Sequence, residues 1–206
     1  MSTKNTILIN KNPKPGILRL VLNEPQSKNA LSREMIFAMM DAISNASSNN
    51  KVKVIIIAAN GDVFSAGHDL KEITNARSHK GDDNSYFMDL FESCSSLMKL
   101  IVECPKPIIA EVNGVATAAG CQLVASCDLA ISSENSRFAT PGVNIGLFCS
   151  TPMVALSRNV SKKEAMKMLL TGDMIDAQEA KRISLINNYV PENDLEKSVM
   201  DLAENI

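Results

Sequence analysis

Apolar runs alternate with amphipathic segments along most of the chain. The run over residues 52–59 is almost continuously apolar, which is typical of a strand buried on both faces. Residues 33 to about 46 carry apolar side chains at helical spacing after Ser32, so the pattern predicts a helix with Ser32 as its N-cap. A longer amphipathic helix is predicted over residues 86–102.

The same patterns predict the remaining elements. Strands are expected over residues 6–10, 16–22, 108–112 and 129–131, and helices over residues 162–171, 177–184 and from about 192 onward. The polar segment 74–85 is expected to be a loop or a short, ragged helix. Strands that alternate with helices indicate an α/β fold. Since neither a linker-like stretch nor an internal repeat is found, a single domain over residues 1–206 is predicted.

Two turns rich in small residues each connect a predicted strand to a predicted helix. They cover residues 64–71 (Phe-Ser-Ala-Gly-His-Asp-Leu-Lys) and 113–123 (Asn-Gly-Val-Ala-Thr-Ala-Ala-Gly-Cys-Gln-Leu). Main-chain amides at a helix N-terminus lack partners within the helix and point towards whatever lies beyond it. Two such turns can donate two hydrogen bonds to one oxygen atom, which is the arrangement of an oxyanion hole.

Composition and charge are those of a soluble globular protein. Of the 206 residues, 45% are hydrophobic and 21% are charged, and the net charge is −2. Because positive and negative residues are interspersed, no nucleic-acid partner is expected. No run approaches ~18 consecutive apolar residues, so no membrane span is expected either. The first residues match neither a secretory signal nor an Arg-rich transit peptide, which predicts a cytoplasmic protein.

The five cysteines show no pairing pattern. Their odd number and scattered positions favour free thiols over a disulfide framework, and no zinc-like spacing is present, so no metal site is expected. A catalytic cysteine usually has a basic partner. The chain has only His68 and His79, so the sequence disfavours Cys149 as a nucleophile.

Several ordered motifs make the chain similar to the crotonase (enoyl-CoA hydratase/isomerase) superfamily. They lie at residues 29–31, 64–71, 106–110, 112–114, 119–121, 127–130 and 138–141. The sequence over residues 116–128 most resembles a divergent branch, the enoyl-CoA hydratase domain-containing proteins. The resemblance implies a spiral of ββα units that forms two roughly perpendicular sheets surrounded by helices. It also implies an acyl-CoA thioester ligand, with coenzyme A as part of the substrate and no separate cofactor.

The resemblance assigns roles to particular residues. By motif, the main-chain amides of His68 and Ala119 would hold the thioester carbonyl oxygen, with the His68 imidazole as a wall of the pocket rather than a general base. The coenzyme would lie against the segment before the first helix and against the first turn. Those residues are Ser27, Lys28, Ala30, Ala66, His68, Asp69, Leu70 and Lys71.

The acid pair of the hydratases is missing from this pattern. By motif, the two carboxyl groups would stand at Gln122 and Gly142. Glutamine cannot exchange a proton at neutral pH, and glycine has no side chain, so little hydratase chemistry is expected. Three functions therefore stay open: an acyl-CoA enzyme with an unassigned proton-transfer group, a non-catalytic acyl-CoA-binding protein, or a scaffold without a ligand.

Other carboxylates lie near the two turns in sequence. Glu111 is the candidate that could reach the pocket from its strand. The alternative is that Glu111 faces outward from the strand. Asp69 is expected to cap a helix, and Glu72 and Asp128 are expected to be surface or capping groups. The family's C-terminal helices are expected to be lacking from this chain, and a homotrimer or hexamer is expected where they are present.

Overall fold

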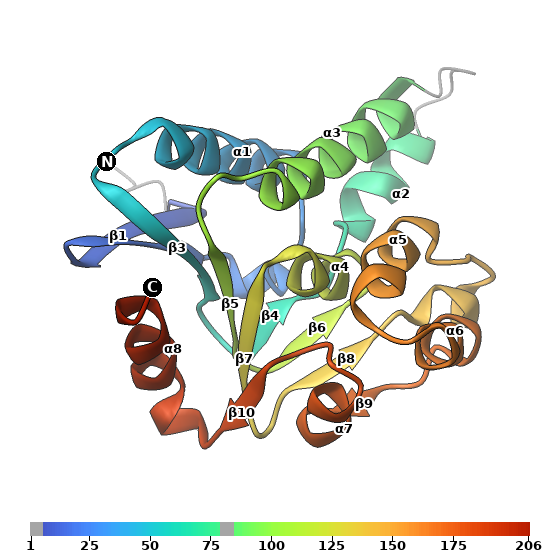
Figure 1. The fold of residues 1–206 in the computed structure, drawn as a ribbon. Helices are drawn as coiled ribbons and strands as arrows, with labels where there is room; N and C mark the ends of the chain where they lie inside the picture. The colour runs from blue at the N-terminus through green and yellow to red at the C-terminus, as the bar shows by residue number, and fades with distance from the viewer. Residues whose placement is uncertain (1–5, 79–84) are drawn as a thin grey trace.

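The computed structural model describes residues 6–78 and 85–206. It contains two sheets with helices around them (Figure 1). The larger sheet has the strand order β1-β2-β3-β5-β7-β10, in which all neighbours are parallel except β1 and β2. Its strands are Leu8–Lys14, Gly16–Leu22, Val52–Ala59, Ile108–Val112, Leu129–Ser133 and Asn188–Val190.

The smaller sheet has the order β4-β6-β8-β9. Strands β4, β6 and β8 are parallel to one another, and β9 is antiparallel to β8. These strands are Val63–Ser65, Val115–Thr117, Arg137–Ala139 and Ile175–Asp176. None of them was predicted, because strands of two or three residues are too short to show a hydrophobic period.

A ββα unit repeats three times along the chain. In each unit the first strand joins the larger sheet, the second joins the smaller sheet, and at least one helix follows. The units are β3–β4 with α2 and α3, β5–β6 with α4, and β7–β8 with α5. These helices are Leu70–Ser78, Ser85–Val102, Ala119–Ser126 and Ser150–Asn159. The spiral implied by the resemblance is therefore confirmed, although the units share no visible sequence repeat.

Further helices complete the two layers around the larger sheet. The main core lies between this sheet and helices α1, α3 and α4, and a second apolar cluster lies under α8 on the opposite face (Figure 1). The remaining helical bounds are α1 Arg33–Ser48, α6 Lys162–Thr171, α7 Ala177–Arg182 and α8 Leu195–Glu204, with 3₁₀ turns at Pro25–Ser27, Pro141–Ile145 and Glu192–Asp194.

Most predicted elements are confirmed, with shifts at their ends. Ser32 caps α1 as expected, since its hydroxyl accepts a hydrogen bond from the Met35 amide at 3.2 Å. Helix α1 ends two residues later than predicted, and α7 ends two residues earlier. Strand β1 continues to Lys14, because its polar second half pairs with β2. Residues 79–84 of the segment predicted to be a loop or ragged helix, His79 among them, lie outside the described residues, as do residues 1–5.

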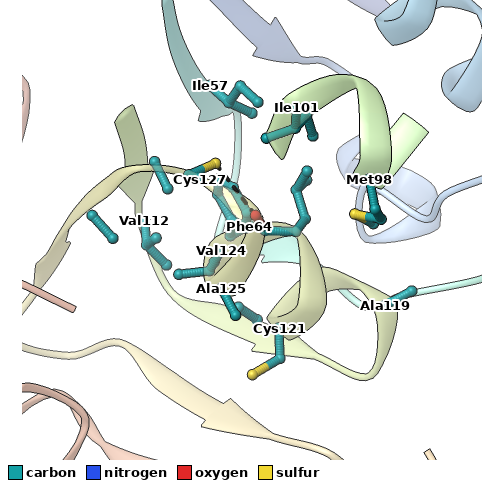
Figure 2. Close-up of a cluster of buried hydrophobic side chains, with 14 of the residues drawn as sticks. Ile57, Phe64, Met98, Ile101, Val112, Ala119, Cys121, Val124, Ala125 and Cys127 are labelled. Carbon is teal, nitrogen blue, oxygen red and sulfur yellow. Dashed lines mark hydrogen bonds between the residues drawn. The ribbon is translucent and has the colours of Figure 1, made fainter. Parts of the chain in front are cut away.

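Helix α4 is the most enclosed helix of the fold. All eight of its residues are buried, and apolar side chains of neighbouring elements pack against it (Figure 2). Ile57 of β3 and Met98 and Ile101 of α3 pack on one side of α4, whereas Cys121 points away from them. A short, buried helix is held in place by its neighbours rather than by its own propensity. Its N-terminus is therefore held in a defined place.

A buried ion pair lies under α8. Arg19 of β2 donates from Nε to the Glu111 carboxylate of β5 at 3.0 Å, and Glu196 of α8 lies 3.4 Å from the same guanidinium. Both side chains project from the face that α8 covers, because they follow Ile17 and Ile109 of that face by two residues. The expectation that Glu111 could reach the pocket is therefore wrong. In the described part of the chain, no helix is long and apolar enough to cross a membrane.

Removal of one partner of this ion pair should be strongly destabilising. We expect Glu111→Ala to lower the free energy of unfolding by about 3 kcal/mol, because the Arg19 charge stays buried with only the exposed Glu196 near it. As a control, Glu179→Ala removes a surface pair with Arg182 and should cost far less, because both charges stay in water. Urea unfolding measures both values, and equal losses in the two variants would contradict the prediction.

Candidate functional site

Three turns meet at one edge of the smaller sheet. Strands β4, β6 and β8 are parallel neighbours, so their carboxyl ends lie side by side. His68 follows the end of β4, Ala119 follows the end of β6, and Gly142 follows the end of β8. The structure thus brings together three of the residues that the sequence assigned to the site.

The turns after β4 and β6 are in direct contact. A Cβ atom built on Gly67 would lie 3.0 Å from the Ala118 Cβ and 3.1 Å from the Ala119 amide nitrogen. The Thr117 hydroxyl donates to the Ala66 carbonyl at 3.2 Å. A Cβ atom on Gly120 would lie only 2.2 Å from the Ser65 carbonyl oxygen. Glycine at these two positions is therefore what allows the turns to approach so closely.

The N-terminus of α4 is buried and has no cap. The first helical hydrogen bond runs from the Gln122 amide to the Ala118 carbonyl at 3.0 Å, and no side chain accepts from the amides before it. Within residues 6–78 and 85–206, the amides of His68 and Ala119 have no acceptor. Buried helix ends normally find partners, so an Ala119 amide without an acceptor at the start of α4 is unusual.

Ala118 carries backbone strain at the same place. Its φ is 50° and its ψ is −121°, a conformation that non-glycine residues rarely adopt. Its amide donates to the Ala139 carbonyl at 2.9 Å, which ties the turn to the end of β8. Such strain costs on the order of 1–3 kcal/mol and persists only where the surroundings enforce it.

The imidazole of His68 packs against α3. Its ring meets the Phe91 ring edge to face, with centroids 5.4 Å apart, and its buried Nδ1 has no hydrogen-bond partner in the described part of the chain. Burial lowers the pKa of His68, and the nearby Leu31 backbone opposes this only in part. The imidazole is therefore neutral at physiological pH and forms a wall beside its own amide.

The segment before α1 runs beside the His68 turn. The Ala66 amide donates to the Lys28 carbonyl at 3.1 Å, and the Leu31 amide donates to the Gly67 carbonyl at 2.7 Å. The residues assigned to the coenzyme therefore lie next to one another. They comprise the half-buried Ser27, Ala66 and Asp69, the exposed Lys28, Leu70 and Lys71, and the buried Ala30.

The carboxylates near the turns have structural partners. Asp69 accepts from the amides of Lys71 and Glu72 at 2.7 and 3.3 Å, so its expected capping role is confirmed. Glu72 accepts from the Tyr86 hydroxyl, and Asp128 accepts from the Ile108 amide at 2.8 Å. No group of three His, Cys, Asp or Glu side chains suited to a metal occurs among the described residues.

The two positions of the missing acid pair differ in their surroundings. Gln122 is buried, and its Oε1 has no partner among the described residues. A Cβ atom on Gly142 would lie 2.6 Å from the Leu147 carbonyl oxygen and 2.8 Å from the Cys149 sulfur. The chain itself therefore occupies the space where a side chain at position 142 would start.

Two further features of the structure were missed by sequence reasoning. The Thr140 hydroxyl is fully buried and has no partner in the described part of the chain. A cleft of about 570 Å³ opens between α3, α4 and α5, with Gln122 and Thr151 among its lining residues. The sequence carried no signal for either, because α5 was not predicted and the cleft exists only when three helices pack together.

Comparisons with known proteins agree with this architecture. The family model for enoyl-CoA hydratase/isomerase matches residues 12–206. The chain therefore belongs to the enoyl-CoA hydratase/isomerase family, which confirms the resemblance. A solved structure of an enoyl-CoA hydratase from Mycobacterium smegmatis superposes with a TM-score of 0.91 at 42% identity, covering 98% of this chain and 76% of that one.

The more specific similarity is to one branch of the family. The mouse protein named enoyl-CoA hydratase domain-containing protein 3, mitochondrial, is 53% identical over 191 residues, which cover 93% of this chain. The crystal structure of the human protein of that name gives a TM-score of 0.90 at 47% identity, covering 97% of this chain and 77% of that one. The chain spans about 62% of the length of the mouse relative.

The expected cytoplasmic location is contradicted by this comparison. Relatives from mouse, rat, frog, human and zebrafish, at 51–53% identity, are all named as mitochondrial proteins. The expectation rested on the first residues and on the overall composition. Neither of these records the compartment in which a folded protein works.

The strain at Ala118 can be tested by substitution. We expect Ala118→Gly to raise the free energy of unfolding by about 1 kcal/mol, since the relieved strain exceeds the added entropy of the unfolded chain. Ala42→Gly, within α1, is the control and should lower the same quantity by about 1 kcal/mol. Urea unfolding of both variants makes the comparison. A lower free energy of unfolding for Ala118→Gly would refute the strain.

The crowding at Gly142 predicts that substitutions at positions 142 and 149 affect stability in a coupled way. We expect Gly142→Ala to cost about 1–3 kcal/mol, because the new methyl group meets the Leu147 carbonyl and the Cys149 sulfur. Cys149→Ala should restore part of this loss through a coupling of at least about 0.5 kcal/mol. Gly146→Ala, where no atom lies within 4 Å of the new Cβ, should show no such coupling. Thermal unfolding of the single and double variants measures it, and additive losses at positions 142 and 149 would contradict this packing.

Proposed function

We propose that this protein binds an acyl-CoA thioester and polarises its carbonyl group, without being an efficient enoyl-CoA hydratase. The carbonyl oxygen accepts from the amides of His68 and Ala119. Family membership supports the ligand class, and the relatives' names support a mitochondrial location. The coenzyme lies along the segment 27–30 and the start of α2, where Lys28 and Lys71 are exposed to solvent and can attract phosphate groups.

The observation that carries this proposal is the pair of free amides on two turns in contact. The amide of His68 and the amide of Ala119 belong to neighbouring turns, and neither has an acceptor within the described residues. Charge that develops on a thioester oxygen is stabilised best by donors that are already in position. A scaffold without a ligand would have no use for a strained turn and a buried, uncapped helix, so the third function is disfavoured.

Weak hydratase activity follows from positions 122 and 142. Glutamine at position 122 can hold water but cannot exchange a proton, and the space beside Gly142 is filled by Leu147 and Cys149. Each acid–base group typically contributes about 10²–10⁴ in rate, so the loss of both leaves mainly carbonyl polarisation. The assembly of three or six subunits implied by the resemblance stays a prediction.

The role of the two amides can be tested by removing the carbonyl from the ligand. We expect butyryl-CoA to bind roughly 30-fold more tightly than S-butyl-CoA, a thioether that lacks only the carbonyl oxygen, because two hydrogen bonds of about 1 kcal/mol each are lost. Isothermal titration calorimetry on the folded protein measures both dissociation constants. Equal affinities would exclude the amides as the carbonyl site.

A parallel assay of crotonyl-CoA hydration tests whether the protein is an inefficient enoyl-CoA hydratase. The rate should be at least about 10²-fold below that of a family hydratase measured under the same conditions. Rapid hydration would show that a proton-transfer group other than the missing acid pair operates in this site. Absence of binding by both ligands, with a cooperative unfolding transition retained, would refute acyl-CoA binding altogether.

A further inference from the structure

Asn29 is the polar residue of the motif at residues 29–31, and its side chain is fully buried. Its Oδ1 accepts from the Glu24 amide at 2.8 Å, and its Nδ2 donates to the Asn60 and Val63 carbonyls at 2.9 and 2.7 Å. Both protons of the side-chain amide are therefore used. Among side chains of this length, only asparagine offers one acceptor and two donors, so the three contacts are specific to this residue type.

The backbone at Asn29 has a conformation that also suits asparagine. Lys28 and Asn29 have φ values of 57° and 49°, so two successive non-glycine residues lie in the left-handed region. Asparagine enters this region more readily than most residues. The Asn29 amide donates to the Glu24 carbonyl at 3.0 Å, so Asn29 bonds to Glu24 through both its main chain and its side chain. Residues 24–30, here called the coenzyme segment, are thereby held as a closed turn.

The side chain of Asn29 joins the coenzyme segment to the turn between β3 and β4. Asn60 directly follows β3, and Val63 begins β4, the strand that leads into the His68 turn. Beyond the end of β4, the Ala66 amide donates to the Lys28 carbonyl at 3.1 Å. The coenzyme segment is thus attached to both ends of β4, and Asn29 supplies the attachment at its start.

Close packing fixes the same joint. A Cβ atom on Gly61, in the turn between β3 and β4, would lie only 2.8 Å from the Cβ atom of Pro25. Pro25 is the first residue of the 3₁₀ turn within the coenzyme segment. Because the two segments are in contact here, a group added between them must displace one of them. The distance from the coenzyme segment to β4 is therefore set by contact as well as by hydrogen bonds.

We propose that Asn29 is a positioning residue, which sets the distance between the coenzyme segment and the His68 amide so that one acyl-CoA contacts both at once. This inference rests on the proposed function. A thioester that is held by its coenzyme brings its carbonyl to the amides only where this distance matches the ligand, because hydrogen bonds weaken steeply when misaligned. Since Asn29 is fully buried, it acts through the segment that it holds rather than on the ligand.

The test compares the two ligands that differ only in the carbonyl oxygen. The ratio of the dissociation constant of S-butyl-CoA to that of butyryl-CoA is here called the carbonyl increment, and it should be roughly 30-fold in the original protein. Asn29→Gly accepts the positive φ and removes the three side-chain hydrogen bonds. We expect it to lower the carbonyl increment below about 3-fold, as measured by calorimetry. A loss of stability alone would leave the ratio unchanged, because both ligands bind the same folded protein.

Gly61→Ala disturbs the same joint and leaves Asn29 in place. Its methyl group meets Pro25, so we expect the carbonyl increment to fall at least about 3-fold. Gly16→Ala is the matched control, because its φ of +85° equals the +86° of Gly61 within a degree. A Cβ atom on Gly16 would meet only the side chain of Lys53, at 3.6 Å, which is an ordinary contact. This variant bears the same backbone strain and should keep the full carbonyl increment.

The outcomes separate this inference from the proposed function. Equal affinities for the two ligands in the original protein would refute the carbonyl site, and this inference would fall with it. A carbonyl increment that survives in folded Asn29→Gly would overturn the inference and leave the proposed function in place. Loss of both ligands from folded Asn29→Gly would show that Asn29 maintains the coenzyme site itself, which would also overturn the inference.

Urea unfolding shows whether each variant is folded. If Asn29→Gly has no cooperative unfolding transition, the comparison of Gly61→Ala with Gly16→Ala decides. A lower carbonyl increment in Gly61→Ala alone would support the inference. Equal carbonyl increments in these two variants would overturn it.

Discussion

The parallel pairing of β4, β6 and β8 is the constraint on which the rest of the site depends. Each of these strands has only three residues, so the small sheet gains little stability from its own hydrogen bonds. It is held instead by the buried helix α4 and by the larger sheet, to which the same ββα units contribute their first strands. Because one topology repeats three times, three strand-to-helix turns reach the same edge, and a ligand placed there meets residues from all three units.

Close approach of the turns has a cost in local stability. Gly67 and Gly120 remove the side chains that would hold the turns apart, and Ala118 stays in a strained conformation between them. The first amides of α4 are buried without acceptors, and three buried polar side-chain atoms nearby have no partner among the described residues. Strain and unpaired groups at one place are what a pre-organised donor site requires, since the donors must not be satisfied by the protein itself.

The chemistry of the edge follows from which side chains remain free. Glu111 is held by Arg19 under α8, Asp69 caps α2, and Asp128 supports the start of β5. No carboxylate among these is directed to the site as an acid or base. What remains is a pair of amide donors, an uncharged histidine wall, a buried glutamine and the Cys149 thiol. In the proposed function, such a site polarises a thioester, and it has no acid–base pair with which to exchange protons.

The sequence by itself determined the α/β class, the strands and helices with a clear hydrophobic period, and the small-residue turns at His68 and Ala119, because these depend on local pattern and motif. Tertiary structure decided the rest. Strands of three residues have no readable period, so the sheet that aligns the turns could not be predicted. Likewise, the partner of Glu111 lies on a strand 92 residues away in the chain, and the contact between Gly142 and Cys149 depends on how one loop folds back. Such contacts are set by packing, which a linear pattern does not encode.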